Sequence, residues 1–220
     1  MPSAAAIRTK SPSRSLLISL VAIAAIAARP LAMRAQQIGH TGPITTLPAP
    51  VRLDPAGKFQ ITYARVGDDI FIAGQPTEAG LRELKAQGVT TIVNLRTPPE
   101  MAKVSFDEAT LVKTLGMTYV YLPVRGDTVF PYAPGTVAKF ADAVAQAQGK
   151  VLLHCTVAWR ASHLWAAYLI EARHVEVEAA LANARGIALD DANPMMLDKG
   201  PQPIEEFLGR RLPTLGHPKP

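Results

Sequence analysis

The sequence predicts an α/β fold of three layers, with a largely parallel central sheet between two layers of helices. Short apolar runs rich in β-branched residues, such as residues 89–95 and 150–154, are typical of buried strands. Helical patterns of about 10–15 residues separate these runs, and this alternation favours parallel strands joined by crossover helices. Sites in such sheets form beyond the carboxyl ends of the strands.

Five strands are expected, at residues 59–63, 70–73, 89–95, 117–122 and 150–154. The first two are short, and the turn residues Gly67-Asp68-Asp69 between them favour a hairpin. Each of the other three lies between helical patterns, as the strands of a parallel sheet do.

Five helices and a short sixth one are expected, at residues 78–87, 98–115, 134–148, 161–172, 175–188 and 204–211. Thr77 is a preferred N-cap residue for the first helix, and Gly88 ends it. Pro98 suits the first turn of the second helix, which Gly116 stops.

Composition divides the chain into a leader (1–35), a Pro/Gly-rich linker (36–57), a folded domain (58–190) and a Pro-rich tail (191–220). The leader is interpreted as a secretory signal peptide, because basic residues up to Arg14 precede the apolar run 16–28. This run is shorter than the roughly 20 residues that a membrane span needs. We therefore expect a periplasmic or secreted protein that contacts a membrane only transiently, with an uncleaved anchor as the alternative.

The net charge of +5 does not indicate a nucleic-acid partner. Five of the 23 basic residues lie in the leader, at Arg8, Lys10, Arg14, Arg29 and Arg34. The other 18 basic residues balance the 18 acidic ones, all of which follow Gln36. Because a nucleic-acid-binding surface needs an excess of positive charge, we expect no such partner.

The single cysteine, Cys155, stands where a predicted strand meets a predicted helix. It has no partner for a disulfide within the chain, so it is either a buried inert thiol or a reactive one. Arg160 follows five residues later, at the start of the helix. A positive charge is unfavourable at a helix N-terminus, so the position of Arg160 needs a reason, and a bound anion supplies one.

A strand–Cys–loop–Arg–helix element has a definite chemistry. The amides of the loop, residues Thr156, Val157, Ala158, Trp159 and Arg160, and those of the first helical turn form a pocket for an anion. A thiol at this pocket loses its proton more easily, and the thiolate is the nucleophile. The guanidinium of Arg160 can clamp a tetrahedral oxyanion through two parallel hydrogen bonds.

Three stretches, residues 72–77, 88–96 and 154–160, resemble the bacterial beta-lactamase-hydrolase-like or phosphatase-like family of the cysteine-dependent protein tyrosine phosphatase superfamily. The resemblance extends over about residues 59–187. It implies a cysteine-phosphatase fold, with Cys155 as nucleophile and Arg160 as phosphate ligand. It also implies a general acid on the loop 124–130, whose one carboxylate is Asp127. The alternative for Asp127 is a solvated turn residue beside Gly126.

The sequence departs from most cysteine phosphatases at three points. They have five residues between Cys and Arg, whereas four separate Cys155 from Arg160, as in rhodanese sulfurtransferases and in the narrower bacterial group. The family usually has Gly where Ala158 stands, and a positive φ there costs Ala about 1–2 kcal/mol. Ala161 follows the arginine where a hydroxyl residue is usual, and Ser162 comes one position late.

Besides Ser162, three further residues are expected to support the loop. His154, at the end of the strand, is expected to buttress it rather than to transfer protons. Gln75 and Arg96 either line the pocket or hold neighbouring loops by hydrogen bonds. The histidines show no metal-ligand spacing, so we expect neither a metal nor a cofactor.

Three functions are compatible with these residues. The first is a cysteine-dependent phosphatase that hydrolyses phosphate monoesters through a phosphocysteine intermediate. The second is a rhodanese-like sulfurtransferase in which Cys155 carries a persulfide. The third is an anion-binding module without turnover. The partner is accordingly a small phosphorylated or sulfur-containing substrate, or a phosphoprotein.

Overall fold

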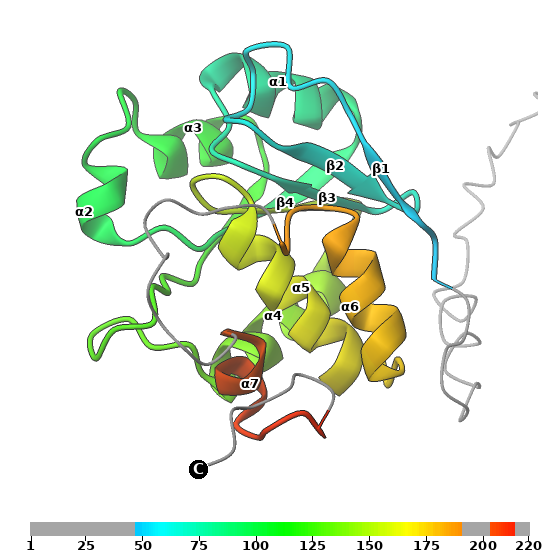
Figure 1. Cartoon of the computed structure of the whole chain (residues 1–220). Helices are drawn as coiled ribbons and strands as arrows, with labels where there is room; N and C mark the ends of the chain where they lie inside the picture. The colour runs from blue at the N-terminus through cyan, green and yellow to red at the C-terminus, as the bar shows by residue number, and fades with distance from the viewer. Residues whose placement is uncertain (1–46, 191–202, 214–220) are drawn as a thin grey trace, which may run out of the picture. The chain divides into compact units, whose positions relative to one another are not determined.

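The computed structural model describes residues 47–190 and 203–213, and these contain a mixed six-stranded sheet (Figure 1). The sheet order is β1-β2-β3-β6-β4-β5, and the strands are β1 (Pro50–Arg52), β2 (Tyr63–Val66), β3 (Ile70–Ala73), β4 (Val89–Asn94), β5 (Thr118–Tyr121) and β6 (Lys150–His154). β1, β2 and β3 pair antiparallel. β3, β6, β4 and β5 pair in parallel, so β6 lies at the centre of the parallel part.

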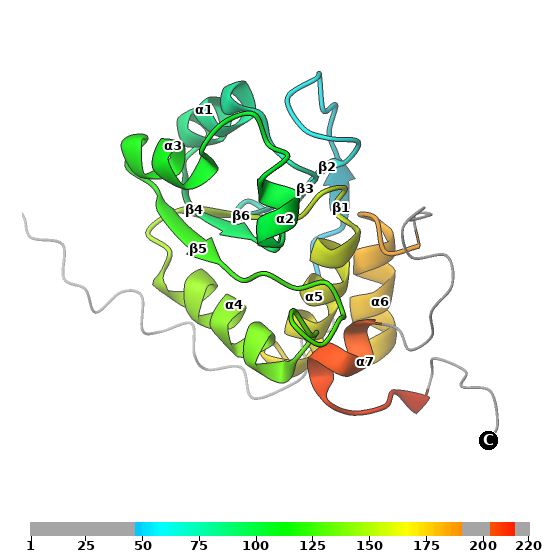
Figure 2. The same ribbon diagram turned by 90° about the vertical axis from the view of Figure 1, so that its left-hand side faces the viewer.

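The helices lie on both faces of the sheet (Figure 2). They are α1 (Glu78–Ala86), α2 (Pro98–Met101), α3 (Glu108–Thr114), α4 (Pro134–Gln146), α5 (Trp159–Glu171), α6 (Val177–Arg185) and α7 (Pro203–Leu208). α1 and α3 cover one face, and α4, α5 and α6 cover the other (Figure 2). The expected α/β class with flanking helices is confirmed, and this arrangement gives the sheet two separate cores.

The two cores take alternate residues of the same strands, as side chains that alternate across a sheet must. In β6, Val151 and Leu153 pack in the core with α4 to α7, whereas Leu152 packs in the core with α1 and α3. All three side chains are buried. The continuous apolar run of β6 therefore corresponds to a strand that is covered on both faces. Packing on both faces fixes the position of its C-terminal end.

The structure corrects several expected boundaries. One helix was expected over 98–115, but two short helices form, because Asp107 accepts a hydrogen bond from the Thr110 amide and caps α3 anew. The first expected strand, at residues 59–63, forms instead at Tyr63–Val66 as β2. A further strand, β1, forms within the expected linker.

The C-terminal segment also departs from a simple tail. α7 packs against α4 and α5, with Phe207 fully buried. The expected leader, residues 1–35, lies outside the described residues. None of the helices that the structure describes is long and apolar enough to cross a membrane.

Candidate active site

The central strand β6 delivers Cys155 to the carboxyl edge of the sheet. β6 pairs with β3 on one side and with β4 on the other, and His154 lies in register with Ala73 and Asn94. The Cys155 amide donates to the Ala73 carbonyl at 3.3 Å, and the Gln75 amide donates to the Thr156 carbonyl at 2.9 Å. The loop from Cys155 to Arg160 is therefore anchored on its neighbours before it enters α5.

Ala158 adopts the left-handed backbone conformation that its position in the loop requires. Its φ is 71° and its ψ is −9°, and it is the N-cap residue of α5. The conformation costs a residue with a Cβ about 1–2 kcal/mol. The strain expected for Ala in place of Gly is therefore present, and the surrounding packing sustains it, since Ala158 is completely buried.

Arg160 reaches from the first turn of α5 across the edge of the sheet to Glu100. Its Nη2 lies 2.5 Å from Glu100 Oε1, and its Nη1 lies 3.0 Å from Glu100 Oε2. Nη1 also donates to the carbonyls of Val124 at 2.7 Å and Leu95 at 3.3 Å. The guanidinium thus joins the segments that follow β4 and β5 to the Cys155 loop.

The carboxylate of Glu100 is fixed from two sides. Its Oε2 accepts from the amide and the hydroxyl of Thr97, both at 2.8 Å, and its Oε1 accepts from the hydroxyl of Thr156 at 2.9 Å. Burial alone would raise the pKa of Glu100, but the hydrogen bonds from Arg160 and Thr97 outweigh burial and lower the pKa to about 2. Glu100 is therefore a permanent anion at neutral pH.

The charge of Arg160 is equally secure. Burial favours its neutral form, but the electrostatic interaction with Cys155 and the hydrogen bonds and negative charge of Glu100 raise the pKa of Arg160. Cys155 itself is 1% exposed. The predicted nucleophile and the predicted anion ligand are therefore both buried, at the end of β6 and in the first turn of α5.

A second buried carboxylate, Glu108, holds the strand end. His154 Nε2 lies 2.9 Å from Glu108 Oε1, and both side chains are fully buried. Asn94 Nδ2 donates to the same oxygen at 3.2 Å, and Gln75 Nε2 donates to Oε2 at 2.5 Å. Burial would raise the pKa of Glu108, but His154 and Gln75 outweigh it and lower the pKa. Through this contact His154 joins the end of β6 to the first residue of α3.

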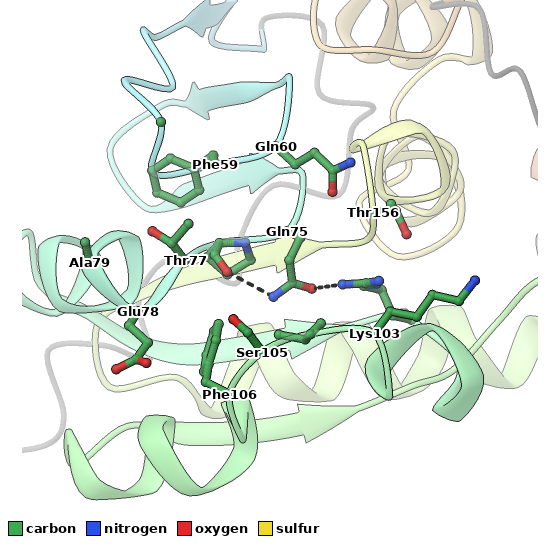
Figure 3. A pocket seen from close by; sticks show the side chains of 14 residues that line it. Phe59, Gln60, Gln75, Thr77, Glu78, Ala79, Lys103, Ser105, Phe106 and Thr156 are labelled. Carbon is green, nitrogen blue, oxygen red and sulfur yellow. Dashed lines mark hydrogen bonds between the residues drawn. The ribbon is translucent and has the colours of Figure 1, made fainter.

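Gln75 and Arg96 connect this network to a pocket beside the Cys155 loop (Figure 3). Arg96 Nη1 donates to the side-chain oxygen of Gln75, and Arg96 Nη2 donates to the Glu100 carbonyl at 2.8 Å. Both side chains also line the pocket, which has a volume of about 740 Å³ and includes Thr156 in its wall. Gln75 and Arg96 therefore hold neighbouring segments together and also line this pocket, whose lining includes Thr156 but not Cys155 or Arg160.

Asp127, Ser162 and Trp159 do not make the contacts that a role in catalysis at Cys155 would require. Asp127 is exposed, and its Oδ1 accepts from the amides of Val129 at 3.0 Å and Phe130 at 2.7 Å, so it closes its own turn. Ser162 Oγ donates to the Ala158 carbonyl at 2.9 Å instead of to the thiol. Trp159 packs its ring on His163, with ring centres 4.1 Å apart.

Sequence reasoning missed Glu100 and Glu108. Thr97-Pro98-Pro99-Glu100 has the spacing of a capping box, which was a visible signal for a helix start. Glu108 follows Asp107, the N-cap residue of α3. Neither signal indicates that the carboxylate turns inward to the Cys155 loop.

The fold and the site together define a protein of the cysteine-phosphatase type, with a Cys–Arg loop at the carboxyl end of a central parallel strand. Residues 65–196 match the family described as DSP-PTPase phosphatase fused to NAD+ kinase, and the chain belongs to this phosphatase family.

Known proteins agree with this assignment. The beta-lactamase hydrolase-like protein of Agrobacterium fabrum is 32% identical over 103 residues, 46% of this chain and 23% of that protein. Its counterpart in Xylella fastidiosa strain Temecula1 is 30% identical over 132 residues, 58% of this chain and 30% of that protein. The chain therefore spans less than a third of these relatives. The structure of PTPMT1 in complex with PI(5)P shares the fold, with a TM-score of 0.54, 18% identity and coverage of 67% of this chain and 92% of that one.

Proposed function

We propose that this protein is a phosphatase that hydrolyses phosphate monoesters through a phosphocysteine intermediate on Cys155. The observation that carries the proposal is that Cys155, directly after β6, and Arg160, in the first turn of α5, are both buried at the two ends of one short connection. The family match, which includes this loop, supports the same chemistry.

In the first step the Cys155 thiolate attacks phosphorus, so an S–P bond forms and the P–O bond to the leaving group breaks. Asp127 gives its proton to the leaving oxygen. In the second step water attacks phosphorus and the S–P bond breaks, which releases phosphate and restores the thiolate. The water proton returns to Asp127. The amides of the loop and the first turn of α5 stabilise the charge on the phosphoryl oxygens in both steps.

This proposal requires two movements from the structure described above. Cys155 is 1% exposed, so the substrate reaches its sulfur only after the loop or its neighbours shift. Asp127 must leave its turn and face the loop, because its carboxylate now accepts from Val129 and Phe130. Such loop closure around a bound substrate is a common step in enzymes.

The decisive assay follows release of p-nitrophenol from p-nitrophenyl phosphate by the purified protein under a reductant. The expected result is turnover that disappears in the variant Cys155→Ser. Rapid quenching of the reaction should trap one phosphoryl group per chain, bound to Cys155. Turnover that persists in Cys155→Ser would disprove the proposed mechanism.

The variant Asp127→Asn tests the acid. It should slow turnover by roughly 10²–10⁴-fold, since that is the usual contribution of a positioned acid. Asp142→Asn is the matched control, because Asp142 is an exposed carboxylate on α4 and has no role in the proposal. If the two variants are equally active, Asp127 is only the turn residue that the structure shows.

Two features of the loop motivate other functions that the same preparation tests. The four-residue spacing between Cys155 and Arg160 is shared with sulfurtransferases, and sulfur transfer from thiosulfate to cyanide is measured in parallel. The left-handed Ala158 and the absence of a hydroxyl residue directly after Arg160 motivate a module that holds an anion without turnover. If sulfur transfer is the only reaction observed and it is lost in Cys155→Ser, the result favours the sulfurtransferase. If the protein binds phosphate but catalyses neither reaction, the result favours the anion-binding module.

We also propose that the protein is exported, on the basis of the basic and apolar pattern of residues 1–35. Expression of the full chain in a bacterial host, followed by fractionation and N-terminal sequencing, tests this. A shortened chain in the periplasm or the medium is expected. A full-length chain in the cytosol would contradict export, and one in the membrane would indicate an anchor.

A further inference from the structure

The pocket of about 740 Å³ shares a wall with the Cys155 loop. Thr156, the residue directly after Cys155, contributes that wall, and the facing walls come from the segment after β3 and the segment between α2 and α3 (Figure 3). The volume is in the range of small-molecule sites. A substrate whose phosphoryl group is held at Cys155 therefore has room for the rest of its body here.

Arg96 gives this pocket a buried positive charge that has no carboxylate of its own. Its side chain donates to two neutral oxygens, those of the Gln75 side chain and the Glu100 backbone, and its Nε is buried without a hydrogen-bond partner among the described residues. Arg96 is 6% exposed. Buried charges are usually paired, so this guanidinium is available to an anion.

The nearby carboxylates do not satisfy this charge. Both carboxylate oxygens of Glu100 accept hydrogen bonds from Arg160. The carboxylate of Glu108 is bound by His154, Gln75 and Asn94. No hydrogen bond or ion pair joins Arg96 to either side-chain carboxylate within the described residues. Their attraction acts only through space, and it partly offsets the effect of burial, which lowers the pKa of Arg96.

A second cation lines the same pocket. Lys103 is exposed and has no ion pair among the described residues. Figure 3 shows Lys103 and Thr156 toward one end of the pocket, whereas Glu78, Phe59 and Phe106 lie toward the other. The carboxylate of Glu78 is 3.8 Å from Arg82, which partly neutralises it. The end nearest the Cys155 loop is therefore positive, and the far end offers aromatic surface.

We propose that the substrate is a small organic phosphate that carries a second anionic group, phosphate or carboxylate, and that Arg96 and Lys103 bind this second group. The inference rests on the proposed function, because it places the first phosphoryl group at Cys155. It goes beyond that function in naming the substrate class and two specificity-determining residues.

The test compares ligands that differ in one anionic group, by calorimetric titration of the full chain carrying Cys155→Ser. The phosphate arm uses fructose 1,6-bisphosphate against fructose 6-phosphate, and the carboxylate arm uses 3-phosphoglycerate against glycerol 3-phosphate. In at least one arm the ligand with two anionic groups should bind 10-fold or more tightly than its partner with one. The arm that shows the larger ratio identifies the second group.

Charge removal then locates the second group. The added substitutions Arg96→Gln and Lys103→Gln should each reduce the affinity ratio at least threefold. Lys113→Gln is the matched control, an exposed lysine on α3 outside the pocket, and should leave the ratio unchanged. Lys103→Gln keeps the test valid if the buried Arg96 variant fails to fold. Equal binding of both ligands in both arms, or a ratio unaffected by Lys103→Gln, overturns the inference.

This outcome is separate from that of the proposed function. Turnover of p-nitrophenyl phosphate with no preference for ligands that carry two anionic groups would retain the phosphatase and reject the second-anion site. A preference that depends on Arg96 and Lys103, without turnover, would retain the binding site and reject the phosphatase.

Discussion

Replacing Glu100 by Gln isolates the charge that holds Arg160 in place. Gln has nearly the same shape as Glu, so the change removes the negative charge with little change in volume. The partner cation then stays buried, because the side chain of Arg160 is only 8% exposed. Removal of one partner from a buried ion pair usually costs about 3–5 kcal/mol, since the other charge is left uncompensated.

The pKa of Glu100 gives an independent magnitude. In the folded protein this pKa is about 2, against 4.5 for an ordinary Glu. One pH unit corresponds to about 1.4 kcal/mol, so the pair contributes about 3 kcal/mol at neutral pH. A lowered folded pKa means that this contribution is complete above about pH 4.5 and is lost as the pH falls toward about 2. Both routes therefore lead to a similar loss in the variant.

Urea unfolding at pH 7 and pH 3 measures this effect. Glu100→Gln should be less stable by about 3 kcal/mol at pH 7, and the difference from the natural protein should shrink by about 2 kcal/mol at pH 3. Glu171→Gln is the control, because Glu171 and Arg210 form a pair 3.0 Å apart that is half exposed. Such surface pairs contribute about 0–1 kcal/mol. Equal stability of the two variants at pH 7, or a stability loss in Glu100→Gln that does not change with pH, would show that the Glu100–Arg160 pair does not stabilise the fold.

Three further substitutions test the loop, its support and the C-terminal helix by thermal and urea unfolding. Ala158→Gly relieves the positive φ of 71° but removes a buried methyl group, so stability should rise by about 0–1 kcal/mol; a loss beyond 1 kcal/mol would mean that the loop is unstrained. Gly74→Ala places a Cβ 1.9 Å from the Gln60 carbonyl oxygen and should cost about 3 kcal/mol or more. Gly135→Ala, the control in helix α4, meets no atom within 4 Å and should raise stability by about 0–1 kcal/mol. Phe207→Ala removes a fully buried ring and should cost about 3–5 kcal/mol, unless α7 does not pack as described.

The sequence predicted those parts of the fold whose signals are local. Residues 150–154 were apolar and short, and Thr77 stood at the start of an amphipathic helix; β6 and α1 form there, with Thr77 accepting from the Gly80 amide. The break between α2 and α3 was missed because Asp107, which caps α3, lies inside a stretch with helical periodicity throughout. β1 was missed because an edge strand of three residues has almost no apolar pattern of its own.

The site was predictable only where its residues share one loop. Cys155 and Arg160 are neighbours in sequence, so the chemistry of the loop could be argued from their spacing. The partner of Arg160 lies 60 residues away, and no periodicity links them. Glu108 and His154 are 46 residues apart and likewise meet only in the folded chain, where β4 pairs with β6 and α3 returns to the end of the sheet. Asp127 stands on the loop where a general acid was expected, but its position in the sequence did not predict that its carboxylate binds the amides of its own turn.

Because Cys155 is buried, the rate at which a thiol reagent labels it measures local opening of the structure around the loop. The chain contains one cysteine, and its side chain is sealed in the structure, so a thiol-specific reagent can label it only during transient fluctuations. The ratio of the labelling rate to that of a free thiol, when closing is faster than labelling, gives the free energy of that opening. An oxyanion that binds the closed loop slows labelling, and one that binds by spreading the loop accelerates it. One spectroscopic time course, without any introduced probe, thus distinguishes a loop that is preformed for its ligand from one that the ligand opens.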